Sequence, residues 1–246
     1  MTGTEEDRNM TDAGQDGQAS FDACWEDLYA AGRHTNRYPF DTVVRFMFLD
    51  RPGDVPIPET RVLEVGCGAG NNLWFAAREG FDVTGIDGSE SAIAFARRRF
   101  EADGLKGDLR VGDFTALPFD DSTFHMAIDR AALSQTPGWA IRKAIAEIRR
   151  VLKPGGCFHL NCYSDRSSSA QRDAHARRDP DGLMHDVTAG SLAGVGQICA
   201  YGKNQVEDLF ADGWSIRNLV HMEQTEMNRP RFEIHAEWLV IAERVD

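Results

Sequence analysis

The sequence predicts an α/β fold, namely a doubly wound, seven-stranded, mostly parallel sheet with an antiparallel hairpin near the C-terminus. From Arg61 onward, short apolar segments alternate with segments of helical period, which is typical of parallel strands joined by helical crossovers. A glycine-rich turn follows the first of these apolar segments. Two long strand-like segments close the chain, and their connection is so short that the pair must be antiparallel.

The individual elements follow from the pattern of apolar residues. Strands are expected at 61–65, 82–86, 108–111, 124–129, 157–163, 214–224 and 231–244. Helices are expected at 70–79, from Ser89 onward and at 137–152, the last ending at a Lys-Pro-Gly-Gly turn. Near the N-terminus, Ser20 is expected to cap a helix and Asp41 to begin another. Asn204 and Glu207 predict a capping box for a short helix that runs through Phe210.

Three regions differ in composition. Residues 1–19 are polar and acidic, so a disordered tail is expected there. Residues 20–58 form a helical cap, and residues 59–246 form the main domain. Within that domain, about 164–201 reads as an irregular insertion rich in Ser, Arg and His, which predicts a lid or a substrate loop; a solvated loop is the alternative.

Composition excludes several classes of function. The formal net charge of -12 over 246 residues, without an evident basic stripe, argues against nucleic acid as a partner. No apolar run reaches the roughly 20 residues of a membrane helix, and the N-terminus has no secretory signal pattern. The five cysteines show no CxxC spacing, which favours reduced thiols in the cytoplasm and no metal site.

The sharpest motif is the turn from Glu64 to Asn72, which contains Gly66, Gly68 and Gly70. Glycines let the backbone approach a ligand closely, and the helix that begins near Asn71 offers free N–H groups to an anionic group. A strand–helix turn without a ligand is the alternative.

Two acidic residues at later strand ends extend this motif. Asp87 ends the second strand, where a carboxylate can accept hydrogen bonds from ribose hydroxyls; helix capping is the alternative. Asp113 and Phe114 follow the third strand and come before Leu-Pro-Phe, where Asp113 can accept from an adenine amino group; a surface turn is the alternative.

In this order, the motifs from Arg61 to Tyr163 resemble those of class I S-adenosylmethionine-dependent methyltransferases. The late hairpin extends the resemblance to Arg244, and it covers about two thirds of the chain when the insertion is left out. The resemblance implies a Rossmann-like methyltransferase fold, S-adenosylmethionine as cofactor, and methyl transfer to an oxygen or nitrogen of a small molecule.

The resemblance also implies roles for particular residues. Glu64, Gly66 and Gly68 would border the methionine part of the cofactor, Asp87 would hold the ribose, and Asp113 and Phe114 would hold the adenine. Gly88 lies where family members often place a side chain against the adenine. The backbone of Asp129 and Arg130 would lie near the reactive methyl group. The set of expected cofactor-binding residues is Glu64, Gly66, Gly68, Asn71, Asp87, Gly88, Asp113, Phe114, Asp129, Arg130, Trp25, Tyr29 and Arg37.

The N-terminal cap contributes the last three of these residues. Trp25 and Tyr29 resemble aromatics that cover the cofactor in some small-molecule methyltransferases, although helical spacing equally suits core packing. Arg37, or Arg33 in the same loop, could pair with a carboxylate of the cofactor or of an acidic substrate; solvated loop charges are the alternative.

Methyl transfer from a sulfonium needs alignment of the acceptor more than a universal catalytic group. A hydroxyl acceptor would need a base, for which His34, Tyr163 and His185 are the candidates. The arginines and histidines of the insertion suggest an anionic acceptor, with solvated charges as the alternative.

Two other functions share parts of the pattern. A nicotinamide-dependent oxidoreductase would have the glycine turn and the ribose acid, but it usually reads GxGxxG where this chain has GxGxG. A non-catalytic protein that binds S-adenosylmethionine would need the same cofactor site.

Overall fold

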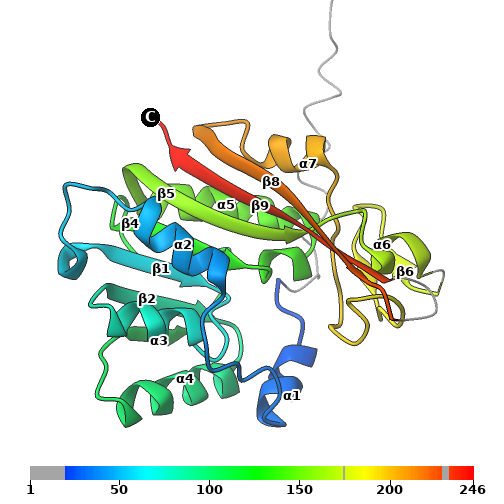
Figure 1. Cartoon of the computed structure of the whole chain (residues 1–246), viewed down its shortest axis with the longest axis horizontal. Coiled ribbons are helices and arrows are strands. Elements are labelled where there is room, and N and C mark those ends of the chain that lie inside the picture. Colours follow the sequence, from blue (N-terminus) through cyan, green and yellow to red (C-terminus); the bar gives the residue numbers. More distant parts are fainter. Residues whose placement is uncertain (1–19, 174, 229–232) are drawn as a thin grey trace, which may run out of the picture.

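In the computed structural model, which describes residues 20–173, 175–228 and 233–246, a seven-stranded sheet lies between two layers of helices (Figure 1). The strand order is β3-β2-β1-β4-β5-β9-β8. β9 pairs with β5 and β8 in antiparallel fashion, and the other neighbours are parallel. The predicted fold class is therefore confirmed.

The parallel part of the sheet consists of five strands and the helices between them. The strands are β1 (Arg61–Val65), β2 (Asp82–Asp87), β3 (Asp108–Val111), β4 (Phe124–Arg130) and β5 (Leu152–Tyr163). The helices are α3 (Asn71–Arg78), α4 (Glu90–Ala102), the short η3 (Leu133–Gln135) and α5 (Gly138–Val151). As predicted, Ser89 caps α4, since its Oγ accepts from the N–H of Ala92 at 3.0 Å. β5 begins five residues earlier than predicted because the Lys-Pro-Gly-Gly turn is part of the strand.

The remaining elements extend the sheet or pack around it. They are α1 (Cys24–Ala30), α2 (Asp41–Leu49), η2 (Ile57–Glu59), α7 (Lys203–Leu209), β8 (Trp214–Glu226) and β9 (Glu233–Arg244). The last two confirm the expected hairpin, although the 231–232 part of the second predicted strand lies outside the described residues. The prediction of a disordered tail at 1–19 also falls outside them.

Two predicted caps are wrong. Ser20 does not begin a helix, because α1 starts at Cys24, whose N–H is bonded instead to Asp22. The capping box of Asn204 and Glu207 is absent as well. The N-cap of α7 is Gly202, two residues earlier, and the Gln205 side chain accepts from the N–H of Gly202.

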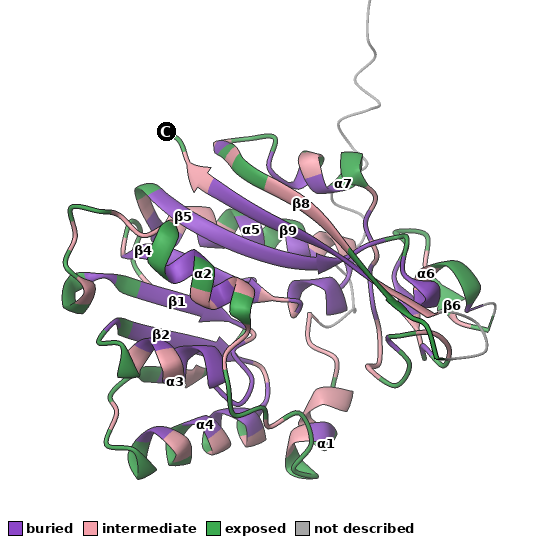
Figure 2. Ribbon diagram, in the orientation of Figure 1, coloured by how far each residue is buried: buried purple, intermediate pink, exposed green. Residues whose placement is uncertain are grey.

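Each face of the sheet has its own buried core (Figure 2). On one face, Phe46 of α2, Leu73 of α3 and Ile93 of α4 pack against β1, β2 and β4. On the other, Ile145 of α5 and Val206 of α7 pack against β1, β4, β5 and β9. Burial of both faces explains why the central strands are apolar throughout.

The insertion is folded rather than irregular. It holds α6 (Ser168–Arg172) and the short strands β6 (Arg177–Arg178) and β7 (Met184–His185), which pair with each other. Met184 and Ile198 pack with Tyr163 in a small apolar cluster. The Asp173 carboxylate accepts from four backbone N–H groups, those of His175, Ala176, Thr188 and Ala189. The Asp173 side chain thus connects residues 175–176 with residues 188–189 of the insertion.

Within the described residues, no helix combines the length and apolar character needed to cross a bilayer. All five thiols are free, and among the described residues no three His, Cys, Asp or Glu side chains gather as metal ligands would.

Candidate functional site

The glycine-rich turn lies at the carboxyl end of β1, where its glycines adopt left-handed backbone angles. The φ values are 61° at Gly66, 51° at Gly68 and 71° at Gly70. A Cβ at Gly66 would lie 2.1 Å from Cβ of Ala132, and one at Gly68 would lie 2.2 Å from the hydroxyl of Tyr29. The turn therefore needs glycine for its angles and for the close approach of two other parts of the chain.

Asp87 fastens this turn to the end of β2. Its two carboxylate oxygens accept the backbone N–H groups of Gly68 and Ser89, each at 2.8 Å. Burial raises the pKa of the Asp87 carboxyl, and these two hydrogen bonds oppose the shift. Because a carboxylate can accept about four hydrogen bonds, both oxygens keep capacity for a ligand.

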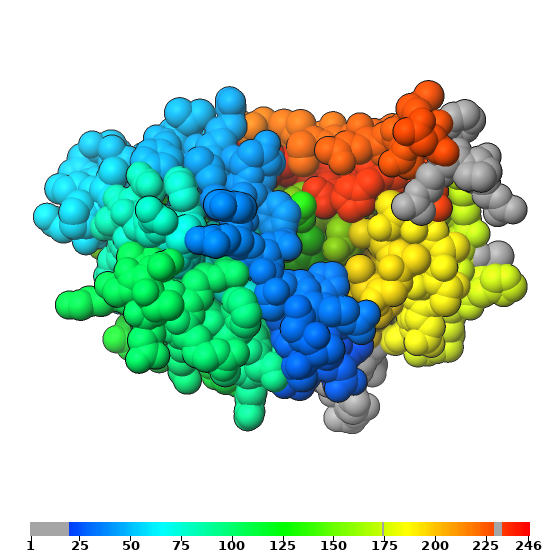
Figure 3. Space-filling view, turned by 60° about the horizontal axis from the view of Figure 1, so that its bottom comes forward, coloured from blue at the N-terminus to red at the C-terminus, as the bar shows by residue number. Residues whose placement is uncertain are grey.

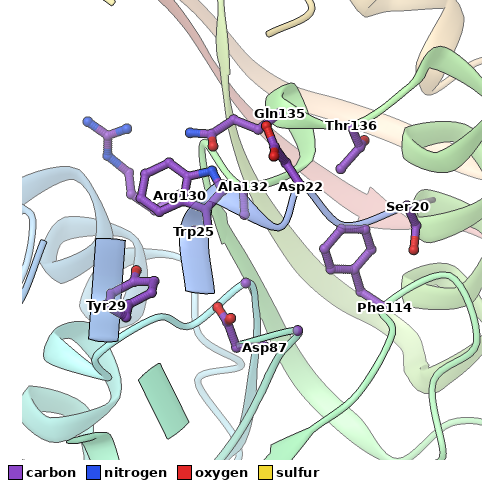
Figure 4. Close-up of a pocket in the computed structure, with 12 residues that line it drawn as sticks. Ser20, Asp22, Trp25, Tyr29, Asp87, Phe114, Arg130, Ala132, Gln135 and Thr136 are labelled. Atoms are coloured by element: carbon purple, nitrogen blue, oxygen red, sulfur yellow. The ribbon is translucent and has the colours of Figure 1, made fainter. Parts of the chain in front are cut away.

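The strand ends open into one continuous cleft made of three adjoining cavities. The first, with about 550 Å³ of empty space, is lined by Asp87, Gly88, Phe114 and Arg130 (Figure 4). The second, of about 780 Å³, shares Trp25, Tyr29, Gly66, Arg130 and Gln135 with the first and reaches Glu64. The third, of about 510 Å³, shares Ser20, Gly88 and Phe114 with the first and reaches Asp113.

Glu64 is the most perturbed acid that lines this cleft. It is 2% exposed, and Asn72 of α3 donates to its Oε1 at 2.7 Å, whereas its Oε2 has no partner among the described residues. Burial raises the pKa of the Glu64 carboxyl to about 8. A buried carboxylate oxygen without a partner suits a cationic ligand group, because such a group would supply the missing hydrogen bond and the opposite charge.

The N-terminal segment closes the cleft from the outside. In Figure 4, Trp25 and Tyr29 lie on one side of Asp87 and Phe114 on the other. Glu26 docks α1 onto α4, since its carboxylate accepts from the hydroxyls of Ser89 and Ser91. Figure 3 shows the N-terminal segment in blue and the insertion in yellow on either side of a hollow.

The adenine end of the expected site is built differently from the sequence expectation. Asp113 reaches the cleft, and its carboxylate accepts from the Ser20 hydroxyl at 2.8 Å and from the N–H of Thr115 at 2.7 Å. Gly88 has no side chain, and the ring of Phe21 occupies the position that a side chain there would take. A Cβ on Gly88 would lie 2.5 Å from this ring. The aromatic wall thus comes from the N-terminal segment.

The two residues that end β4 have different surroundings. Asp129 is fully buried and lines none of the three cavities; its Oδ1 accepts from the N–H of Leu133, and burial raises its carboxyl pKa to about 7. Arg130 lines the cleft, bonds Glu237 at 3.2 Å and stacks on the Phe40 ring at 4.3 Å. Asn71 also lines the cleft, and its side chain donates to the carbonyl of Tyr38.

Of the remaining candidates, two lie at the cleft. His34 lines the second cavity, packs edge-on against Trp25, and has its pKa lowered by burial and by Arg33. Tyr163 lines the same cavity and accepts from the Gln135 side chain; burial raises its pKa to about 12, so its hydroxyl stays protonated. A protonated phenol is a poor base at neutral pH.

Two other candidates lie away from the cleft. His185 lies in the β6–β7 pair of the insertion, where its Nε2 is 2.7 Å from Asp179. Arg37 is exposed, lines none of the three cavities, and has its guanidinium 5.9 Å from the centre of the Tyr38 ring. Neither residue lines any of the three cavities of the cleft.

Several cleft residues carry no motif in the sequence. Asp22 accepts from the N–H of Gln197, whose side chain donates to the carbonyl of Gln135, so the segment, the insertion and η3 are joined above the cleft. Glu237 is the one residue with a sequence signal, since it is an acid within the apolar run of β9. The others are Phe21, Asn36, Phe40, Ala132, Thr136 and His235.

Comparison with known proteins agrees with this geometry. Residues 62–156 match the family model of the methyltransferase domain. A demethylmenaquinone methyltransferase of Symbiobacterium thermophilum is 39% identical over 119 residues, which cover 44% of this chain and 42% of the relative. A phthiotriol/phenolphthiotriol dimycocerosates methyltransferase of Mycobacterium tuberculosis is 36% identical over 151 residues, which cover 60% of this chain and 54% of the relative. The chain thus spans about half or less of the length of these relatives.

Solved structures share the architecture. An S-adenosylmethionine-dependent methyltransferase from Methanosarcina mazei superposes with a TM-score of 0.61 at 21% identity, covering 85% of this chain and 99% of that one. A [4+2]-cyclase superposes with a TM-score of 0.61 at 20% identity, covering 91% of this chain and 93% of that one. At such identities the likeness concerns the fold.

The residues of the cleft fit S-adenosylmethionine. The unpartnered Oε2 of Glu64 suits its ammonium group, and the N-terminal end of α3 suits its carboxylate. Asp87 has capacity for the ribose hydroxyls, and Phe21, Phe114 and Asp113 provide two rings and an acceptor for the adenine. The buried carboxyl of Glu64 beside the glycine-rich turn suits an ammonium group better than the pyrophosphate of a nicotinamide cofactor, which argues against the oxidoreductase interpretation.

Proposed function

Because the chain contains a class I S-adenosylmethionine-dependent methyltransferase domain, we propose that the protein transfers the methyl group of this cofactor to an oxygen or nitrogen atom of a small molecule. The observation that carries the proposal is the single cleft that joins Glu64, Asp87 and Asp113 at three neighbouring strand ends. Its far end, beyond the glycine-rich turn, leaves room for an acceptor beside Tyr163 and Glu237.

The polarity of that far end supports an oxygen or nitrogen acceptor over a carbon acceptor. Some relatives are named for carbon chemistry, among them a squalene methyltransferase of Botryococcus braunii that is 38% identical over 104 residues, 41% of this chain and 27% of the relative. A hydrocarbon acceptor would need an apolar pocket. Here Arg130, His235 and Glu237 line the wall instead.

The protein's own contribution to the reaction is binding, alignment and the exclusion of water. When bound, S-adenosylmethionine supplies an electrophilic methyl group on a positively charged sulfur. Trp25 and Tyr29 cover the cleft from α1, and their ring faces suit such a positive charge. Of the candidate bases, we favour His34, because it lines the cleft and is exposed at its rim.

An anionic acceptor gains little support from the arginines. Arg130 is paired with Glu237, Arg166 with Glu223, and Arg177 with Asp179. The acceptor we propose is therefore a small molecule without a required negative charge. The free thiols further support a reducing compartment such as the cytoplasm.

The proposal is tested in two steps. Calorimetry with S-adenosylhomocysteine, the demethylated cofactor, measures binding, and NAD serves as the negative control. Transfer of a labelled methyl group into a library of hydroxyl and amine compounds then measures turnover. Binding without any transfer would identify a non-catalytic S-adenosylmethionine-binding protein, and the absence of binding would overturn the assignment of the site.

Asp87 provides the sharpest variant for this test. Asp87→Asn removes the charge that accepts ribose hydroxyls, so we expect the affinity for S-adenosylhomocysteine to fall roughly 10- to 100-fold, the scale of a hydrogen bond to a charged group. Asp82→Asn, at the exposed start of the same strand, is the matched control and should leave the affinity unchanged. Equal affinities in the two variants would show that Asp87 does not contact the cofactor.

A further inference from the structure

A fourth cavity adjoins the cleft on the side away from Asp87. It has about 670 Å³ of empty space and lies between the first residues of α2, the end of β4, and strands β5, β8 and β9. It shares Phe40, Arg130, His235 and Glu237 with the second cavity of the cleft. A molecule in this cavity would therefore lie next to the end of the cleft that we assign to the methyl acceptor.

Three side chains that line this cavity hold buried polar atoms without a hydrogen-bond partner among the described residues. They are Oγ1 of Thr42, Nε of Arg130 and Oδ1 of Asn161. The Asn161 side chain is 1% exposed, and its amide nitrogen already donates to the carbonyl of Trp238. Buried polar atoms in native proteins are nearly always paired with protein, ordered water or a ligand, so these three atoms mark positions that a bound molecule can complete.

The charges around the cavity limit what this ligand can be. Glu237 is 6% exposed, and its Oε1 lies 3.2 Å from Arg130 and 2.9 Å from Nε2 of His235. Phe40 covers the Arg130 guanidinium at 4.3 Å. Arg130, the one arginine among the described residues that line this wall, thus already has a carboxylate partner, and a second acid, Asp41, lines the same cavity. A carboxylate or phosphate would meet no unpaired cation here.

The open hydrogen-bonding positions include both acceptors and donors. Asn161 offers a carbonyl oxygen, Thr42 a hydroxyl, and Arg130 a single N–H donor. A hydroxyl group can satisfy both kinds of partner, and an amino group can satisfy the acceptors. An acid-lined cavity also favours a ligand that is neutral or positively charged.

We propose that this cavity recognises the methyl acceptor and that the acceptor carries at least two neighbouring hydroxyl or amino groups and no negative charge. The proposal rests on the proposed methyl transfer at the adjoining cleft. Thr42 and Asn161 are the residues that determine this specificity, because their unpaired oxygens come from two different elements that line the cavity, α2 and β5.

The test measures binding to the full chain saturated with S-adenosylhomocysteine. The probes are glucose, glucosamine, catechol and 2-aminophenol, with glucuronate and benzoate as anionic counterparts. We expect at least one hydroxyl or amino probe to bind, and its anionic counterpart to bind at least about tenfold more weakly. Thr42→Val and Asn161→Leu should each weaken that binding about 3- to 10-fold, the effect of one hydrogen bond.

Matched controls separate recognition from stability. Thr225→Val and Asn218→Leu change exposed residues of β8 and should leave probe binding unchanged. Thr42→Val removes a buried hydroxyl without a partner, so we expect it to keep or raise the melting temperature while it weakens the probe. A purely structural role for Thr42 would not give this combination.

The outcomes distinguish the two proposals. If S-adenosylhomocysteine binds but none of the four hydroxyl or amino probes does, or if an anionic probe binds most tightly, the acceptor class is wrong and the cofactor site stands. If the probe affinities are the same in wild type, Thr42→Val and Asn161→Leu, the cavity is not the recognition site. If S-adenosylhomocysteine itself does not bind, the proposed function fails first.

Discussion

Individual residues of the glycine-rich turn bring together parts of the chain that are distant in sequence. The turn touches Tyr29 on one side and Ala132 on the other, and Asp87 holds it through the N–H of Gly68. Such contacts leave no volume for side chains, which makes the residue type at each position testable.

Gly66→Ala should destabilise the protein by about 2–5 kcal/mol. The left-handed angle alone costs about 1–2 kcal/mol, and the new Cβ must also displace Ala132, for which overpacking costs about 1–3 kcal/mol. Gly104→Ala is the matched control, since Gly104 has a φ of 64° and open space around its Cβ position. Urea unfolding of both variants separates the two contributions, and equal losses would exclude crowding at Gly66.

The raised pKa of Glu64 predicts that cofactor binding is coupled to proton release. Its pKa of about 8 leaves the carboxyl mostly protonated at pH 7. An ammonium group at Oε2 would favour the ionised form, so binding of S-adenosylhomocysteine at pH 7 should release about one proton, and affinity should rise with pH up to about 8. Calorimetry in buffers of different ionisation enthalpy measures this release. Glu64→Gln should abolish it, and an unchanged release would assign it to another group.

At the scale of elements, the cleft depends on the docking of α1. The helix has seven residues and one buried side chain, Leu28, so its own stability is small. The Ser89 hydroxyl donates to Glu26 at 2.6 Å at the start of α4, and Asp22 links the same segment to the insertion. Trp25 and Tyr29 therefore cover the cleft only while these polar contacts hold.

Glu26→Ala should loosen this cover without unfolding the domain. We expect the affinity for S-adenosylhomocysteine to fall roughly tenfold, because hydrogen bonds to a charged group contribute about 1.5–3 kcal/mol. Proteolytic cleavage near α1 should become faster, whereas the melting temperature should change little. Asp27→Ala, at the exposed neighbouring position, is the control. Unchanged affinity in Glu26→Ala would mean that α1 does not contribute to binding.

At the scale of the whole molecule, a buried histidine in the central sheet makes stability depend on pH. His159 is fully buried next to Phe46, and burial lowers its pKa to about 4 from the usual 6.5. The unfolded chain therefore takes up a proton near pH 6.5, while the folded protein resists it until pH 4. The free energy of unfolding therefore keeps its full value above pH 6.5. It decreases as the pH falls toward 4, by up to about 3 kcal/mol.

His159→Phe should reduce this loss of stability at acid pH. Chemical unfolding between pH 7 and 4 should show a smaller loss of stability in His159→Phe than in the wild type. His175→Asn, which changes an exposed histidine of the insertion, should follow the wild type. If the free energy of unfolding decreases equally with pH in His159→Phe and the wild type, other groups, such as the buried acids, determine the loss of stability at acid pH.

The architecture as a whole does not decide the reaction. The same fold is present in a methyltransferase and in a [4+2]-cyclase at nearly equal structural similarity. What separates such proteins is the set of side chains at the strand ends. For this chain, that set is the cofactor cleft together with the cavity of Thr42, Arg130, Asn161 and Glu237.

The sequence alone determined the sheet, the glycine-rich turn and the positions of the acids Asp87 and Asp113 at neighbouring strand ends. These features follow from local rules, since period, turn chemistry and the position just after a strand are all read within a few residues. Glu64, Gly66 and Gly68 could be placed for the same reason. Local rules failed at the caps of α1 and α7, where a neighbouring side chain made the hydrogen bond instead.

Only the tertiary structure decided how the cleft is closed and what adjoins it. Phe21 lies over Gly88, and Arg130 bonds Glu237 across 107 positions of sequence. Glu237 faces the site because the antiparallel register of β5 and β9 places it opposite Tyr163. Register and packing between distant segments depend on the whole fold, whereas the pattern around one strand end does not.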